Sequence, residues 1–323
     1  MQVRDFADGA LIDQVLLVRG ADVRSRRDGS EMLRLTLGDR TGLVTGIITT
    51  EVPRVAQECP VGYPVRIQGR FTRHERFGPQ IEVESVRVAD EHEFDPAELM
   101  DSPLRSAAQM EADLRELVAT IQDRHLQRLL TLLLGEASPT WALYREAPAA
   151  KRYHQAYRHG LLEHSLGVAQ AVSAISATFP GIDREVAVTG ALLHDIGKLE
   201  AYEMQGEAIE MADEGRLFGE IALGYYRVRR AIEELDGFPP ATARAVLHII
   251  LSHHGSLEHG SPVIPCTREA TLVHMIDNLG GRLGSFDRLE KSLASGSEWS
   301  VFDKGIGGGA YFAGAPSITR RAA

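Results

Sequence analysis

The sequence predicts a multidomain protein in which a small closed β-barrel precedes an all-α helical bundle. Residues 10–90 alternate apolar and polar side chains with a period of two, whereas beyond residue 105 apolar side chains recur every three or four positions. An acidic stretch with two prolines separates these regions, as a linker would. We therefore expect a barrel over residues 1–90, a linker over 91–105, a helical domain over 106–295 and a glycine-rich, partly mobile tail over 296–323.

The barrel is expected from about five short strands within some 80 residues. Turn signals at 27–29, 39–42 and 77–79 separate the alternating segments LIDQVLLVRGADVRS, EMLRLTLGDRTGLVTGIIT, YPVRIQGRFTRHE and PQIEVESVRVAD. The runs LRLTLGDRTGLVTGII and VRIQGRF…GPQIEVESV resemble the OB-fold nucleic-acid-binding domains. This resemblance implies a barrel that binds single-stranded nucleic acid.

One stretch of the barrel, VRIQGRFTRHERFG, places apolar and basic side chains on opposite faces. Arginines beside an exposed aromatic ring are typical of a single-strand groove, because charge follows the phosphates and a ring stacks on a base. The alternative is an edge strand kept soluble by arginines, with Phe71 and Phe77 in the core. The predicted nucleic-acid-binding residues are Arg66, Arg70, Arg73, Arg76 and Phe77.

The net charge of −10 is unevenly distributed. Residues 1–90 hold 13 arginines, no lysine and 13 acidic residues, so the acidity lies in the rest of the chain. An acidic helical domain fits a cation site, although acidic solvated faces are also common.

No apolar run reaches the length of a membrane span, the N-terminus carries charge early, and Cys59 and Cys266 lack zinc-site spacing. We expect a cytoplasmic protein without a membrane partner.

Helical spacing begins in AAQMEADLRELVATIQ and RHLQRLLTLLLG, and further helices are expected near 160–178, 184–195, 219–235, 241–253 and 268–283. Most of the 12 histidines fall in this part, in YHQAYRHGLLEHSLGVAQ, LLHDIGK, ILSHHGSLEHGSP and LVHMIDNLGG. A single buried histidine is usually a packing residue. Several, joined by aspartates, indicate a metal site, because neutral imidazole and carboxylate bind Mn, Fe, Co, Ni or Zn for hydrolysis.

The motif ALLHDIGK has a simpler interpretation when it is taken alone. Gly197 could close a helix in a left-handed conformation, and His194 and Lys198 would be favourable beside the helix C-terminus. Lys198 could instead reach a substrate phosphate. His274 stands three residues before Asp277, on the same helix face, and is expected to support the metal ligands without binding the ion.

The order H…HD…HH…D on successive helices resembles the HD-domain metal-dependent phosphohydrolases. With the OB-like barrel, the stretches HQAYRHGLLEHSLGVA, LLHDIGKLEAY, DEGRLFGE, LSHHG and MIDNLGG resemble the YhaM family of 3′→5′ exoribonucleases over nearly the whole chain. The resemblance places His253 and His254 at a second metal or at the substrate phosphate. It implies a metal-binding set of His164, His194, Asp195 and Asp277.

The sequence departs from that family at Glu220, where the matching stretch normally carries a histidine that would complete a second metal site. Glutamate can still bind a metal and would favour Mn or Mg, being a harder oxygen donor. Alternatively the second metal is weakened, Glu220 acts as a general base, or it is a surface residue without a role.

The leading hypothesis is a metal-dependent 3′→5′ exonuclease that hydrolyses single-stranded RNA or DNA. The barrel would grip the strand, and a metal ion would activate a water molecule in the helical domain. The expected cofactor is one or two divalent ions, Mn²⁺ before Co²⁺, Fe²⁺, Ni²⁺ or Mg²⁺. The expected catalytic residues are His194, Asp195, Lys198, His253 and His254. The alternatives are an HD-type nucleotide or cyclic-nucleotide phosphohydrolase with a regulatory barrel, and a non-catalytic single-strand-binding protein.

Overall fold

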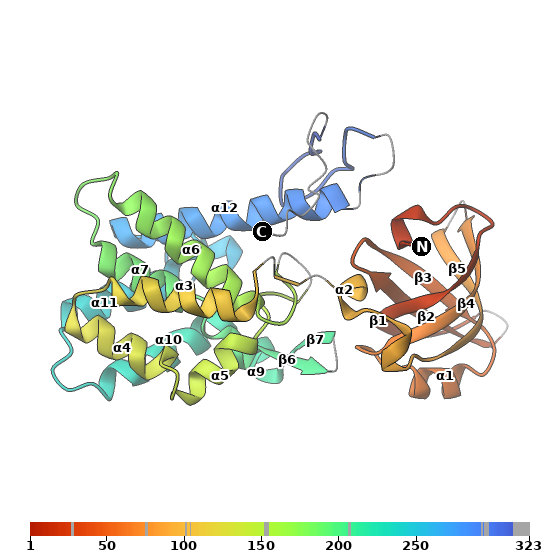
Figure 1. Cartoon of the computed structure of the whole chain (residues 1–323), viewed down its shortest axis with the longest axis horizontal. Helices are drawn as coiled ribbons and strands as arrows, with labels where there is room; N and C mark the ends of the chain where they lie inside the picture. Colours follow the sequence, from red (N-terminus) through yellow and green to blue (C-terminus); the bar gives the residue numbers. More distant parts are fainter. Residues whose placement is uncertain are drawn as a thin grey trace. The chain divides into compact units, whose positions relative to one another are not determined.

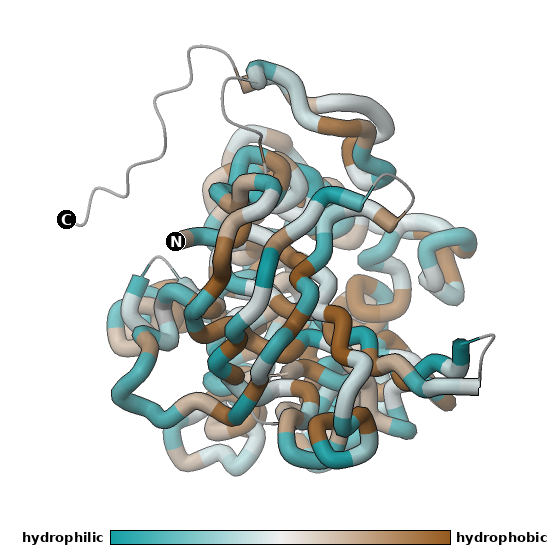
Figure 2. The backbone as a smooth tube through the Cα atoms, turned by 90° about the vertical axis from the view of Figure 1, so that its right-hand side faces the viewer, coloured by the Kyte–Doolittle hydropathy of each residue, from teal (hydrophilic) through white to brown (hydrophobic). Residues whose placement is uncertain are grey.

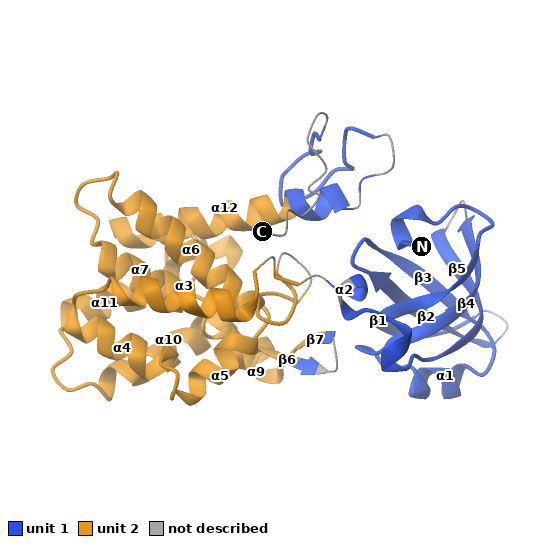
Figure 3. Ribbon diagram, in the orientation of Figure 1, with its two compact units in different colours: residues 1–101, 204–208, 286–323 blue, residues 102–203, 209–285 orange. Residues whose placement is uncertain are grey.

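The computed structural model describes residues 1–26, 29–74, 77–100, 102–103, 105–151, 155–205, 208–291, 293 and 297–312. The chain divides into two compact units, coloured separately in Figure 3. One comprises residues 1–101, 204–208 and 286–323, and the other residues 102–203 and 209–285. The predicted fold class is confirmed, since a closed five-stranded barrel precedes a helical domain along the chain (Figure 1).

The barrel has the strand order β1-β2-β3-β5-β4, with β4 returning to β1. The pair β3–β5 is parallel and the other neighbours are antiparallel. A helix between β3 and β4, α1 (Val52–Glu58), was not expected from the sequence. The strands are β1 (Leu11–Ser25), β2 (Glu31–Asp39), β3 (Gly42–Ile48), β4 (Pro64–His74) and β5 (Gly78–Val88).

The period of two along the strands produces the barrel core. Val65, Ile67 and Phe71 of β4 are buried, while the alternate residues Arg66, Gln68 and Arg70 lie outward, as predicted. The alternation is visible as changes between brown and teal along the strands in Figure 2. Buried side chains from all five strands and α1 form one apolar cluster inside the barrel.

The stretch expected to be a linker is partly built into the barrel unit. It contains the short helices η2 (Glu91–Glu93) and α2 (Pro96–Leu99). Leu99 is buried, and the Arg40 backbone N–H donates to the Glu98 carbonyl at 3.0 Å. The barrel unit therefore extends about ten residues beyond the predicted boundary.

The helical domain confirms the helices expected from apolar spacing and adds several short elements. The spacing could not reveal α5, α8, α9 or the β6–β7 hairpin, which are four to eight residues long. The elements are α3 (Ala107–Ala119), α4 (Arg124–Leu134), α5 (Pro139–Glu146), α6 (Gly160–Ser176), α7 (Arg184–Leu193), α8 (Lys198–Ala201), β6 (Tyr202–Gln205), β7 (Ala208–Met211), α9 (Asp213–Phe218), α10 (Glu220–Glu233), α11 (Pro240–Ser252), η3 (Leu257–His259) and α12 (Arg268–Lys291).

The C-terminal region contains a longer helix than expected. Helix α12 continues to Lys291, beyond the predicted end near residue 283. Residues 297–312 carry two isolated antiparallel bridges, Trp299–Tyr311 and Asp303–Gly308.

An N-terminal 3₁₀ helix, η1, spans Val3–Asp5. None of the helices in the described parts of the chain combines the length and apolarity needed to cross a membrane.

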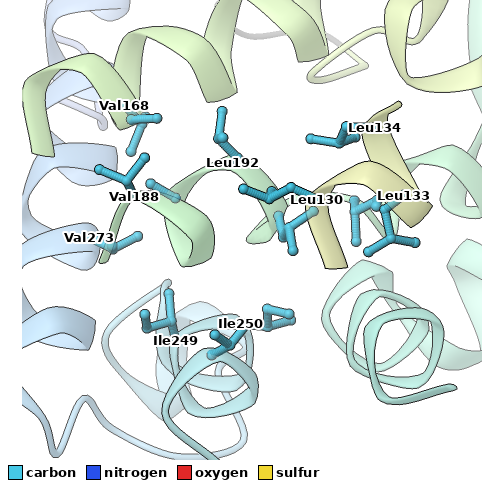
Figure 4. Close-up of a cluster of buried hydrophobic side chains, with 14 of the residues drawn as sticks. Leu130, Leu133, Leu134, Val168, Val188, Leu192, Ile249, Ile250 and Val273 are labelled. Atoms are coloured by element: carbon cyan, nitrogen blue, oxygen red, sulfur yellow. The ribbon is translucent and has the colours of Figure 1, made fainter. Parts of the chain in front are cut away.

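Helix α7 forms the centre of the helical domain. All of its residues from Val186 to Leu193 are buried, because α6 and α11 pack against it. Figure 4 shows side chains from α4, α6, α7, α11 and α12 meeting around it, among them Val188, Leu192 and Ile250. Asp183 caps the helix N-terminus by accepting the backbone N–H groups of the first turn. This packing fixes the position of the residues that follow Leu193.

Candidate metal centre

Two core helices end at histidines. His194 follows the last residue of α7 and His253 follows the last residue of α11. In each ring, Nδ1 lies 2.7 Å from the carbonyl oxygen three residues earlier, that of Ala191 or Ile250. Carbonyls in the last turn of a helix lack an intrahelical donor, so a ring N–H that donates to them is favoured. This bond leaves the lone pair on Nε2, the nitrogen that faces the other site residues.

A first set of three ligands forms around His194. His164 from α6 places its Nε2 3.2 Å from the His194 Nε2 and 3.1 Å from Oδ1 of Asp277, which comes from α12. The three ligand atoms lie within 4.8 Å of one another, the geometry that one metal ion requires. Both histidines are buried, with 5% of His164 and 1% of His194 exposed.

A second set, which consists of Asp195, His253 and His254, lies directly beside the first. Asp195 separates the two sets. Its Oδ1 is 3.5 Å from the His253 Nε2, and its Oδ2 is 3.3 Å from Nε2 of both His164 and His194. The structure therefore brings together six of the seven predicted ligands.

The donors fit a divalent transition-metal ion. All four rings engage Nδ1 with an oxygen, so their Nε2 atoms are the ligating atoms. Asp195 Oδ1 and His253 Nε2 are buried and have no hydrogen-bond partner among the described residues. Buried polar atoms without a partner are costly, and a cation would satisfy them. Imidazole and carboxylate without thiolate suit Mn, Fe, Co, Ni or Zn, and the two sets provide for one or two ions.

Even without a metal ion, the carboxylates of the cluster favour a positive charge on His164. Burial lowers the pKa of His164, but hydrogen bonds to Asp195 and Asp277 outweigh it and raise the pKa from 6.5 to about 9. Burial raises the pKa of Asp195, yet Lys198 and His194 hold it well below the ordinary value. Asp195 is therefore ionised, and His164 holds a proton that a metal ion would displace.

The stability of the protein is expected to change with pH in opposite directions with and without bound metal. In a chelator, His164 stabilises the fold below its unfolded pKa near 6.5, and this contribution is lost as the pH rises through about 9. With Mn²⁺ present, the ion must displace that proton, so the stabilisation by metal should grow over the same range. The measurement is the unfolding temperature from pH 6.5 to 9.5 in chelator and in Mn²⁺. A His164→Gln variant should lose the difference in slope, and parallel slopes in the wild type would contradict the assignment.

Lys198 is bound to the carboxylate at the centre of the site. Its Nζ donates to Asp195 Oδ2 at 2.6 Å, and only 14% of its side chain is exposed. Burial lowers the pKa of Lys198, but Asp195 raises it above the ordinary value, so the ammonium group stays charged. The interpretation of Lys198 as a lysine at a helix end that faces solvent is therefore excluded. Lys198 orients Asp195 and leaves its Oδ1 directed at the second set.

The expected left-handed conformation of Gly197 is wrong. Its φ and ψ of −69° and −14° are right-handed helical values, open to any residue. Glycine is required instead because α10 approaches closely. A Cβ at this position would lie 1.9 Å from the Glu220 carbonyl oxygen and 2.4 Å from the Gly224 nitrogen. The absence of a side chain lets the turn that carries Asp195 touch the start of α10.

That contact places Glu220 at the edge of the second set. Its Oε1 lies 3.7 Å from the His254 Nε2, and both side chains are 27% exposed. Glu220 is near the ligands but outside the two groups of three, so its assignment as a ligand stays a prediction. His274 contacts the backbone of a predicted ligand, since its Nδ1 lies 2.8 Å from the His253 carbonyl oxygen, and its supporting role stays a prediction. The sequence reasoning missed Gln155, whose Oε1 lies 3.0 Å from the His164 Nδ1.

The predicted nucleic-acid-binding residues of the barrel differ in their surroundings. The Arg66 guanidinium pairs with Asp13 at 2.8 Å and with Glu93 at 3.0 Å, so its charge is balanced within the barrel unit. Arg70 donates to the Gly9 carbonyl at 3.0 Å but remains exposed, as does Arg73. Phe77 is 63% exposed, whereas Phe71 belongs to the core. Arg76 and His154, a histidine of the metal motifs, lie outside the described residues.

Comparison with known families identifies the helical site. Residues 161–281 match the family model described as the HD domain. The matched range runs from α6 into α12 and contains all seven predicted ligands. With the buried histidine and aspartate cluster, the match indicates a metal-dependent phosphohydrolase with a divalent ion as cofactor.

Proposed function

We propose that this chain is a 3′→5′ exonuclease that hydrolyses single-stranded RNA or DNA, as the YhaM-like combination of motifs implies. One observation carries the proposal. An HD-type metal cluster shares the chain with a closed OB-like barrel, in which Arg73 near the end of β4 and Phe77 in the following turn are exposed. Exposed rings and arginines suit a strand without base pairing, because every base has a face on which a ring can stack.

The chemistry depends on how the site residues are held. A divalent ion in the cluster, with Mn²⁺ preferred, would act as a Lewis acid and make hydroxide available near neutral pH. Asp195, fixed by Lys198, and the buried His253 serve as ligands, since neither is open to solvent. His254 and Glu220 are the most exposed of the predicted ligands, ahead of Asp277. The His254 Nε2 can bind the ion of the second set, and Glu220 can accept a proton or complete that set.

An end-labelled oligoribonucleotide incubated with the protein and Mn²⁺ tests the proposal. Stepwise shortening from the 3′ end, absent in chelator, is the expected result. An oligonucleotide blocked at its 3′ end should resist, and one blocked at its 5′ end should not. Binding without cleavage would instead indicate a single-strand-binding protein.

Phe77→Ala should weaken binding of long single strands by about 1–3 kcal/mol, the usual value for loss of one base-stacking ring. The rate at saturating RNA should stay unchanged, because Phe77 belongs to the barrel unit and contributes nothing to the metal cluster. Electrophoretic mobility shift at several salt concentrations and single-turnover cleavage measure the two effects. Tyr63→Ala is the matched control, since Tyr63 is another exposed aromatic residue of the barrel unit. Equal losses in both variants would argue against a defined stacking position.

A second candidate function has support from the charge balance of the barrel. Glu93 pairs with both Arg66 and Arg87, and Asp13 also pairs with Arg66. Strands β2 and β3 contain no aromatic residue in their sequence. Both features favour an HD-type nucleotide or cyclic-nucleotide phosphohydrolase with a regulatory barrel. Hydrolysis of mononucleotides or cyclic nucleotides, with the oligoribonucleotide left intact, would establish this alternative.

A further inference from the structure

We infer that Gln155 is a positioning residue that sets the metal affinity of the cluster by fixing the ring of His164. The inference rests on the metal assignment made for the proposed function, and it concerns a residue outside the ligand sets. Gln155 Oε1 lies 3.0 Å from the His164 Nδ1, the nitrogen opposite the ligating Nε2. A ring held in this way keeps its lone pair directed at Asp277 and His194.

His164 differs from the other three histidines in the type of its partner. His194, His253 and His254 each place Nδ1 against a backbone carbonyl, the first two against carbonyls of their own helices. These carbonyls are fixed by the fold. His164 lies within α6 and depends on a side chain from the segment before that helix. Of the four Nδ1 partners, only Gln155 contributes a side chain, so it is the only one that a substitution can remove.

The orientation of the Gln155 amide follows from its second contact. Its Nε2 lies 3.5 Å from the Glu163 carboxylate, and the Tyr157 hydroxyl donates to the same carboxylate. A carboxylate only accepts hydrogen bonds, so the amide nitrogen faces Glu163 and the amide oxygen faces His164. The charge of Glu163 polarises the amide, and this makes Oε1 a better acceptor for the imidazole N–H. The chain Glu163–Gln155–His164 thus raises the basicity of a metal ligand.

The backbone around Gln155 is shaped to present this side chain. Gln155 has a left-handed φ of 58°, an uncommon conformation for a residue other than glycine. Its carbonyl accepts the Ala149 N–H at 3.1 Å. Gly160 begins α6 against this turn, and a Cβ there would lie 2.0 Å from the Gln155 carbonyl oxygen. The turn and the first residues of α6 are therefore fitted to each other.

Metal titration of the full chain tests the inference. Gln155→Met keeps an unbranched side chain but removes the acceptor, and it should weaken Mn²⁺ binding about 10- to 100-fold, as for other partners of metal-bound histidines. The exchange Gln155→Glu with Glu163→Gln restores an acceptor for His164 and an amide donor beside it. This double variant should bind Mn²⁺ at least as tightly as the wild type. Unfolding temperatures in chelator verify that all three proteins fold, and that of Gln155→Met should be lower because the buried His164 N–H loses its acceptor.

Two results would overturn the inference: unchanged Mn²⁺ affinity in Gln155→Met, or an exchanged pair that binds no better than Gln155→Met. Both are measured without substrate, so they are independent of the nuclease assay. A wild-type protein that binds Mn²⁺ and depends on Gln155 but leaves RNA intact would refute the proposed nuclease and keep the inference. A wild-type protein that binds no divalent ion would refute both.

Discussion

Asp195→Asn is expected to abolish turnover and to remove bound metal from both ligand sets. Asp195 is the only described residue whose two carboxylate oxygens face the two sets, with Oδ1 toward His253 and Oδ2 toward His164 and His194. Outer partners of metal ligands already change affinity by about 10- to 100-fold, so loss of a central ligand should exceed about 100-fold. Elemental analysis of the purified protein and single-turnover cleavage measure the two losses. RNA affinity measured in chelator should be unaffected.

The same substitution should also lower stability, because Lys198 would keep its buried charge without a partner. Breaking a buried ion pair typically costs about 3–5 kcal/mol. The double variant Asp195→Asn with Lys198→Met should recover much of that free energy of unfolding without recovering metal, which separates the two roles of Asp195. Asp183→Asn is the matched control, an exposed carboxyl group at the other end of α7. Retained metal in Asp195→Asn would refute the site assignment.

Gly197→Ala should destabilise the helical domain by about 3 kcal/mol or more and weaken metal binding. The added Cβ meets backbone atoms of α10, which cannot move aside as a flexible side chain can. Separation of α10 from the turn would displace Glu220 and the turn that carries Asp195 and Lys198. Chemical denaturation in chelator gives the stability, and Mn²⁺ titration gives the affinity.

Gly167→Ala provides the matched control for this substitution. Gly167 lies inside α6, and a Cβ there would have no neighbour within 4 Å. Replacement of an open helical glycine by alanine should stabilise the protein by roughly 0.5–1 kcal/mol. The two variants are thus expected to change stability in opposite directions. A neutral Gly197→Ala would show that close approach of α10 is not the reason for glycine.

The sequence predicted the barrel strands well because each has one buried face. On β4 the alternation of Val65 and Ile67 with Arg66 and Gln68 has only one arrangement that buries the apolar set. The linker was harder to predict. Its attachment to the barrel unit includes ion pairs of Glu93 with Arg66 of β4 and Arg87 of β5, and composition carries no information about such contacts.

The cluster of histidines and aspartates was visible in the sequence of the helical domain, and the resemblance to the HD phosphohydrolases implied which of them bind a metal. The arrangement of the ligands into two groups, with Asp195 between them, requires the packing of four segments and could not be read from spacing. Gln155 escaped notice because glutamine has no special signature in a turn and its role depends on contacts with α6. The conformation of Gly197 was predicted wrongly because the helix-end interpretation considered α7 without α10.

The ligands extend from His164 to Asp277, on segments that lie together only when the helical core has formed. A metal ion would therefore bind the native chain much more tightly than the unfolded one, and its availability would become a factor in the abundance of the protein. An ion at about one hundred times its dissociation constant adds roughly 2.7 kcal/mol to the free energy of unfolding. Cells starved of that ion would hold about a hundredfold more unfolded chain, open to chaperones and proteases. The cluster would then couple the lifetime of the protein to metal supply.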